Sequence, residues 1–113
     1  MKPPIFLIAT LFFFNVISCG GPLPEEDFSD TWASNWCGRA KRCDPSFVDR
    51  WDNKAACVAD MTDVADIWLG LGTLFCDYDP ASGRQCIRAV NEGNCADFLD
   101  YAPETDLQCS LCG

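Results

Sequence analysis

Apolar side chains recur three or four residues apart in a stretch that begins near residue 28. The members of this stripe are Phe28, Trp32, Trp36, Ala40 and Cys43. Such spacing places them on one face of an α-helix. Acidic residues 25–27 suit the positive N-terminal end of that helix, and Asp44-Pro45 ends it because the residue before a proline avoids the α region. The pattern therefore predicts a helix over about residues 25–43.

A second stripe with the same spacing predicts another long helix. Its members are Cys57, Met61, Val64, Ala65 and Trp68. Asp52 or Asn53 can cap the N-terminus of this helix, which we expect to run to about Leu69. We expect Gly70 and Gly72 to end it, because glycine is a poor helix former.

Residues 47–51 lie between these two helices and predict a bridge of about one or two turns. A third helix is predicted to begin at Pro80, a residue type favoured at the first helical position, with Asp79 before it as the cap. We expect this helix to run to about Asn91, with Gly93 closing it.

Shorter elements complete the chain. Asn94 can cap a fourth helix, whose apolar positions are Cys95, Phe98 and Leu99. Residues 105–112 are expected to form a last turn or two. No stretch alternates apolar and polar residues at every second position, as a half-buried strand would. We therefore expect an all-α fold, a small disulfide-rich bundle of about four to five short helices.

The N-terminal segment lacks this periodicity. Lys2 gives it a positive start, and residues 5–17 are an almost unbroken apolar run. The run is shorter than the roughly 20 residues that a helix needs to cross a bilayer, and it has the length of the apolar core of an export signal. Residues 1–18 are therefore predicted to be a signal peptide.

The apolar run ends in Val16-Ile17-Ser18-Cys19, which has the form of a bacterial lipobox. In a lipobox the chain is cut before the cysteine, whose sulfur then carries a diacylglyceryl group. We expect lipidated Cys19 to anchor the protein to a membrane, with residues 19–24 as a tether and residues 25–113 as the helical domain. Gly20, in place of Asp, resembles the sorting pattern of outer-membrane lipoproteins in diderm bacteria. Ordinary signal cleavage after Gly20 is the alternative, and it would release a secreted effector or inhibitor.

Composition narrows the range of partners. Cleavage before Cys19 removes Lys2 and leaves 17 acidic and seven basic side chains, a net charge of about −10. Such a chain is repelled by nucleic acid and by anionic lipid headgroups, so we expect no nucleic-acid partner. The partners that remain are the membrane, through the N-terminal lipid, and an envelope or extracellular protein or glycan.

Eight cysteines remain when Cys19 is set aside, an even number that favours disulfide pairing in an exported domain. They are Cys37, Cys43, Cys57, Cys76, Cys86, Cys95, Cys109 and Cys112. Cys43 and Cys57 flank the first interhelical turn, and we expect them to pair; the other pairings stay open. Zinc is the competing use of so many thiols, but the chain has no histidine and its only close pair is Cys109 and Cys112. We therefore expect no metal and no cofactor.

Catalysis lacks its usual residues. Without a histidine, a serine or cysteine nucleophile has no customary base. Asp60, Asp63 and Asp66 recur three apart on the second helix and are interpreted as a solvated face. Asp77 and Asp79 would give a hydrolase a pair of carboxylates, but Asp79 is already needed as a helix cap. We do not expect an enzyme, and a small hydrolase is the third hypothesis after the lipoprotein and the secreted effector.

Aromatic residues at helical spacing are expected in the core of the domain. Trp51 differs because it lies in the connection between the first two helices. An exposed Trp51 beside Phe47 would form a contact surface for a protein or a glycan. These two residues are therefore a candidate binding site.

Three runs in the C-terminal half carry a resemblance to a bacterial family. They are residues 76–81 (CDYDPA), 86–90 (CIRAV) and 95–99 (CADFL), followed by Cys109. Together with the lipobox, they resemble the small cysteine-rich lipoproteins of myxobacteria and related bacteria. The resemblance implies an exported, lipid-anchored protein and supplies no activity. The sequence thus predicts a cell-envelope lipoprotein that acts as a non-catalytic binding or structural module.

Overall fold

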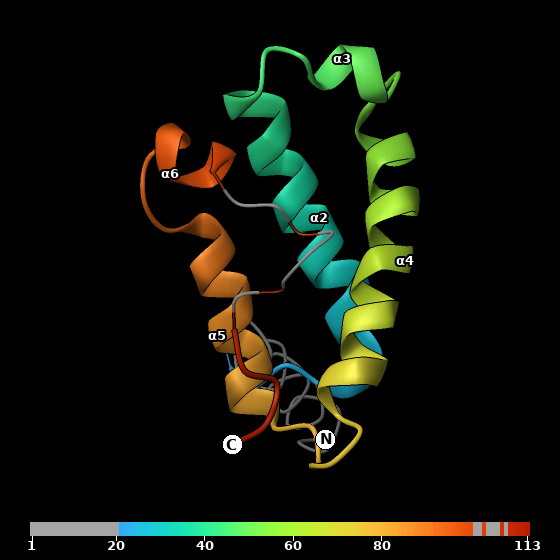
Figure 1. Ribbon diagram of the computed structural model, residues 1–113, viewed down its shortest axis with the longest axis vertical. Coiled ribbons are helices and arrows are strands. Elements are labelled where there is room, and N and C mark those ends of the chain that lie inside the picture. Colours follow the sequence, from blue (N-terminus) through green and yellow to red (C-terminus); the bar gives the residue numbers. More distant parts are fainter. Residues whose placement is uncertain (1–20, 101–102, 104–106, 108) are drawn as a thin grey trace, which may run out of the picture.

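The computed structural model describes residues 21–100, 103, 107 and 109–113. These residues form five α-helices and one isolated bridge between Tyr78 and Cys112 (Figure 1). The helices are α2 (Glu25–Cys43), α3 (Phe47–Arg50), α4 (Lys54–Gly72), α5 (Pro80–Asn91) and α6 (Cys95–Leu99). The prediction of an all-α fold is confirmed.

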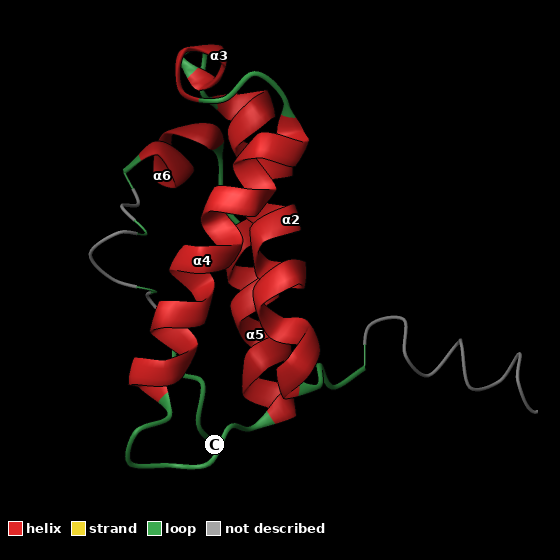
Figure 2. Ribbon diagram, turned by 90° about the vertical axis from the view of Figure 1, so that its right-hand side faces the viewer, coloured by secondary structure: helices red, strands yellow, loops and turns green. Residues whose placement is uncertain are grey.

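Helix α2 lies at the centre of the domain. It packs against α4 on one side and against α5 and α6 on the other. Helix α3 crosses the end of the domain where α2 finishes and α4 begins (Figures 1 and 2). Phe28 and Trp32 of α2 have no exposed surface. The apolar stripe predicted for the first helix is therefore the surface on which the other helices pack.

Trp36 joins three parts of the core. Its ring centroid lies 6.3 Å from that of Trp32, 5.9 Å from that of Trp51 and 5.5 Å from that of Phe98. Aromatic pairs in this range contribute about 0.5–1.5 kcal/mol beyond the burial of their area. One side chain of α2 thus links that helix to α6 and to the connection after α3.

Three helices begin at the side-chain caps that the sequence predicts. Asn53 and Asp79 each accept, through a side-chain oxygen, a backbone N–H of the following helix at 2.9 Å. Asn94 and Asp97 form a reciprocal capping box at the start of α6. These bonds satisfy N–H groups that the first turn of a helix leaves without a helical partner.

Helix α4 is longer than expected. It continues through Gly70 to Gly72 and does not end near Leu69. Glycine costs a helix only about 1 kcal/mol relative to alanine. In addition, the backbone N–H and the side-chain hydroxyl of Thr73 both donate to the Leu69 carbonyl, at 3.2 and 2.7 Å. These bonds satisfy the Leu69 carbonyl in the last turn of α4, so the helix continues through the two glycines.

The last turn predicted over residues 105–112 is wrong at the positions that the structure describes. Leu107 and residues 109–112 are not helical. The backbone of this segment bonds instead to the loop before α5, where the N–H of Asp79 donates to the Leu111 carbonyl at 2.8 Å. Residues 105, 106 and 108 lie outside the described residues.

All eight cysteines of the domain are paired. The pairs are Cys37–Cys57, Cys43–Cys95, Cys76–Cys112 and Cys86–Cys109. The first two disulfides join α2 to α4 and to α6. The other two join the C-terminal segment to the loop between α4 and α5, through Cys76, and to α5, through Cys86. The prediction of a disulfide framework is confirmed.

The predicted pairing of Cys43 with Cys57 is wrong. Cys37 and Cys43 are six residues apart, so their side chains differ by about 240° around the axis of α2 and lie on different faces of the helix. Cys37 faces α4, where its Cα lies 5.9 Å from that of Cys57. Cys43 lies on the face of α2 that contacts α6, where its Cα is 5.2 Å from that of Cys95. The prediction is based on the equal distances of Cys43 and Cys57 from the turn along the chain. It does not take into account which face of α2 Cys37 and Cys43 each lie on.

Gly83 allows the Tyr78 side chain to cross the first turns of α5. A Cβ atom at this position would collide with the Tyr78 hydroxyl. Gly70 is the opposite case, because a Cβ there would meet no atom within 4 Å. Both glycines lie inside helices, where alanine is intrinsically better by about 1 kcal/mol.

We expect Gly83→Ala to lower the free energy of unfolding by about 1–3 kcal/mol, because overpacking outweighs the gain in helix propensity. Gly70→Ala is the matched control and should raise the free energy of unfolding by up to about 1 kcal/mol. Guanidinium unfolding followed by circular dichroism, with the disulfides intact, measures both changes. If both alanines stabilise the domain, Tyr78 does not constrain position 83.

Candidate functional site

The cysteine sulfurs of the domain are all used in disulfides. Each of the eight is oxidised in a pair, so none is a free thiolate that could hold zinc or attack a substrate. Within the described ranges, no group of three or more His, Cys, Asp or Glu side chains could hold a metal ion. Four disulfides in a small domain point to an extracytoplasmic protein. Cys19, the predicted lipidation site, lies outside the described residues.

The predicted contact surface of Phe47 and Trp51 is wrong, because both side chains are buried. Their exposed fractions are 2% and 6%, and their ring centroids lie 5.2 Å apart. Trp51 donates its indole N–H to the Asp60 carboxylate at 2.8 Å, and the Arg50 guanidinium carbon lies 4.2 Å from the Trp51 ring centroid. A connecting residue is exposed only if no neighbour covers it, and here α3 and α4 enclose the indole.

The acidic residues that the sequence singles out are exposed to solvent or accept hydrogen bonds within the domain, as Asp60 does from Trp51. Asp63 and Asp66 are exposed on α4, and Asp77 is exposed in the loop before α5. The Asp79 carboxylate accepts both the N–H and the hydroxyl of Ser82, at 2.9 and 2.8 Å. Asp79 therefore acts as the cap that was predicted, and the carboxylate pair of a hydrolase has no support from its position.

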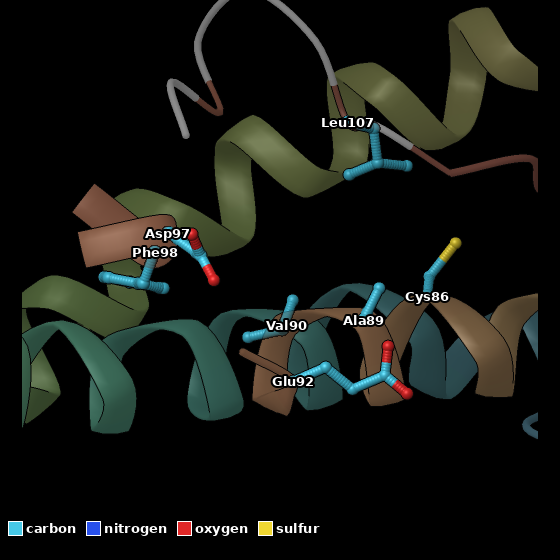
Figure 3. A pocket seen from close by; sticks show the side chains of 7 residues that line it. All are labelled: Cys86, Ala89, Val90, Glu92, Asp97, Phe98 and Leu107. Carbon is cyan, nitrogen blue, oxygen red and sulfur yellow. The ribbon is translucent and has the colours of Figure 1, made fainter. Parts of the chain in front are cut away.

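A small cavity lies between α5 and α6, with Phe98 and Leu107 on one side of it and Val90 and Ala89 on the other (Figure 3). Its volume is about 200 Å³, and Cys86, Glu92 and Asp97 complete its lining. Small-molecule sites are commonly about 300–1,000 Å³. Asp97 is already used in the capping box of α6. We therefore assign no ligand to this cavity.

Arg39 is a buried charged residue that the sequence analysis missed. Only 6% of it is exposed. Its guanidinium donates to the carbonyl oxygens of Val90, Glu92 and Gly93 at 2.8, 3.1 and 2.6 Å, and its carbon lies 5.5 Å from the ring centroid of Phe98. The end of a helix leaves carbonyl groups without helical partners, and Arg39 supplies the donors at the end of α5.

No local pattern in the sequence identifies this role. Arg39 lies between Trp36 and Ala40 of the apolar stripe, where a long basic side chain ordinarily extends its charged end into solvent. The three carbonyl groups that it binds belong to residues that follow Arg39 by 51, 53 and 54 positions in the chain. Arg39 is therefore a structural residue that connects α2 to the α5–α6 turn.

The N-terminal start of the described domain is fixed against α5. The backbone N–H of Leu23 donates to the Pro80 carbonyl at 3.0 Å, and the Tyr78 hydroxyl donates to the Leu23 carbonyl at 2.7 Å. Arg84 Nε donates to the Gly21 carbonyl at 2.8 Å. Burial raises the pKa of Tyr78, which keeps its hydroxyl neutral and able to donate at ordinary pH. The chain is therefore held in place from residue 21 onward.

None of the helices in the described part of the chain combines the length and apolarity that a membrane span requires. No protein-family model, curated protein or solved structure matches the chain. The resemblance to cysteine-rich lipoproteins of myxobacteria stays a prediction. The evidence for a function therefore comes from the lipobox and from the geometry of this domain.

We expect Arg39→Met to lower the free energy of unfolding by about 2–4 kcal/mol, because three carbonyl groups lose their donor and one of them is buried. Arg42→Met is the control, since Arg42 is exposed on the same helix, and it should change stability by less than about 0.5 kcal/mol. Guanidinium unfolding of both variants measures the difference. Equal, small losses would contradict the structural role of Arg39.

Proposed function

We propose that the protein is a cell-envelope lipoprotein, anchored by acyl chains on Cys19 and sorted to the outer membrane. Its helical domain acts as a non-catalytic binding or structural module. The observation that carries the proposal is a lipobox at residues 16–19 directly before a domain with four disulfides. Export delivers both features to the same side of the cytoplasmic membrane, where thiols can oxidise.

The anchor is sufficient by itself. A lipoprotein cysteine bears two or three acyl chains, and each buried methylene contributes about 0.8 kcal/mol, so attachment is stable without a membrane-spanning helix. The free part of the predicted tether is also short, because Gly21 is already bonded to Arg84 and the two residue steps from Cys19 to Gly21 span at most about 7 Å. The domain would therefore stay close to the membrane surface.

The described domain supports a role without catalysis. Its tryptophans are used in packing or in hydrogen bonds to the protein, as with Trp51 to Asp60 and Trp68 to the Pro103 carbonyl at 2.7 Å. Its cysteines are paired, and its surface is strongly acidic. Such a domain suits the display of a stable surface to an envelope or extracellular protein or glycan.

The second candidate is a secreted effector or inhibitor. Ordinary signal cleavage after Gly20 would produce it, and Ser18 and Gly20 are the small residues that this cleavage requires. The mature chain would then begin at Gly21 and carry no lipid. The two candidates differ in the cleavage site and in the lipid on Cys19, so the N-terminus of the mature chain separates them.

We expect wild-type protein, expressed in a bacterium that processes lipoproteins, to begin at Cys19 and to carry acyl chains. Cys19→Ser should retain residues 1–18, because the thioether that precedes cleavage cannot form. Asn15→Ser, just outside the lipobox, is the control and should be processed like the wild type. N-terminal peptide mass spectrometry measures all three chains.

The secreted alternative predicts a different result. The wild type and both variants would then begin at Gly21 without lipid. That outcome would overturn the anchor.

A further inference from the structure

Four apolar side chains remain exposed at the end of α4 and in the loop after it. They are Ile67 at 60%, Leu71 at 54%, Leu74 at 63% and Phe75 at 98% exposure. Ile67 and Leu71 are one turn apart on α4, and Leu74 and Phe75 come directly after Thr73, the C-cap of that helix. We call these residues the apolar patch. A group of exposed apolar side chains of this kind marks a surface that contacts something else.

The apolar patch is held in a defined position. Cys76, next to Phe75, is bonded to Cys112, and Tyr78 pairs with the same cysteine in the isolated bridge. A Cβ at Gly72 would lie only 3.1 Å from a methyl carbon of Leu111, so the end of α4 packs closely against the C-terminal segment. The loop that presents Leu74 and Phe75 is therefore fixed at both ends.

The apolar patch lies at the end of the domain where α2 and α5 begin, opposite α3 (Figures 1 and 2). The chain enters the domain at this same end. Tyr78, three residues after Phe75, holds the Leu23 carbonyl, and Gly21 is bonded to Arg84 of α5. Cys19 is within about 7 Å of Gly21, so its acyl chains would attach at the same end of the domain as the patch, although the chain enters on the face across from the end of α4 (Figure 2).

We propose that the apolar patch rests on the membrane that holds the acyl chains of Cys19, with Leu74 and Phe75 in the interfacial layer. This inference depends on the proposed function, because it requires the lipid anchor. A lipid surface is the occupant that the geometry favours, since the short tether brings the bilayer within reach of the patch whether or not a partner protein is present. The domain would then stand with α3 directed away from the membrane.

The acidic residues at this end determine which lipids the patch can meet. Asp77 is exposed two residues from Phe75, and Glu25, Glu26 and Asp27 form the first turn of α2. Anionic headgroups would repel these carboxylates. The patch therefore suits a zwitterionic surface, where apolar contact does not compete with like-charge repulsion.

Tryptophan fluorescence in vesicles tests the contact. Phe75→Trp places a probe in the patch, and Val48→Trp places the matched probe on α3 at the opposite end, where Val48 is 70% exposed. The lipidated mature proteins are incorporated into phosphatidylcholine vesicles with or without brominated acyl chains, which quench an indole that touches them. The emission of the wild type is subtracted. We expect the added emission of Phe75→Trp to shift to shorter wavelength and to lose most of its intensity, and that of Val48→Trp to do neither.

Flotation of the same vesicles separates the two possible failures. If the proteins float with the vesicles but the Phe75→Trp emission is not quenched more than that of Val48→Trp, the membrane contact is overturned and the lipid anchor is retained. The patch would then belong to a protein partner or to a second copy of this chain. If the wild type carries no acyl chain and does not float, the anchor and the membrane contact are both overturned.

Discussion

The fixed position of α2 is the constraint on which the rest of the domain depends. One disulfide joins it to α4 and another joins it to α6, while Arg39 binds the carbonyls at the end of α5. The Trp36 ring packs against Trp51 and against Phe98 of α6. A domain of this size has a modest core, and each disulfide contributes about 2–4 kcal/mol by restricting the unfolded chain. The covalent bonds and the buried arginine therefore give short helices a single arrangement.

This arrangement makes the two ends of the domain different. At one end, α3 covers the aromatic core and buries Phe47 and Trp51. At the other end, Gly21 and Leu23 are bonded to the start of α5, and Phe75 stands almost fully in solvent. A lipid on Cys19 would attach at this second end, so the fold gives the proposed anchor a direction as well as a position.

The parts of the structure that depend on neighbouring residues could be predicted from the sequence. The helix stripes and the caps at Asn53, Asp79 and Asn94 are of this kind, because spacing and capping act within about one turn. The pairing of Cys43 could not be predicted, since it depends on which face of α2 meets α6. The burial of Trp51 and the role of Arg39 depend in the same way on contacts between distant segments. The lipobox is also a local signal. It is the part of the proposed function that can be predicted from the sequence without the structure.

The deciding measurement is the intact mass of the mature protein, purified from the cells and the medium together and treated with an alkylating agent without reductant. We expect a chain that begins at Cys19, carries the added mass of two or three acyl chains, and gains no alkyl group because all eight remaining cysteines are paired. A chain that begins at Gly21 with no added lipid would contradict it.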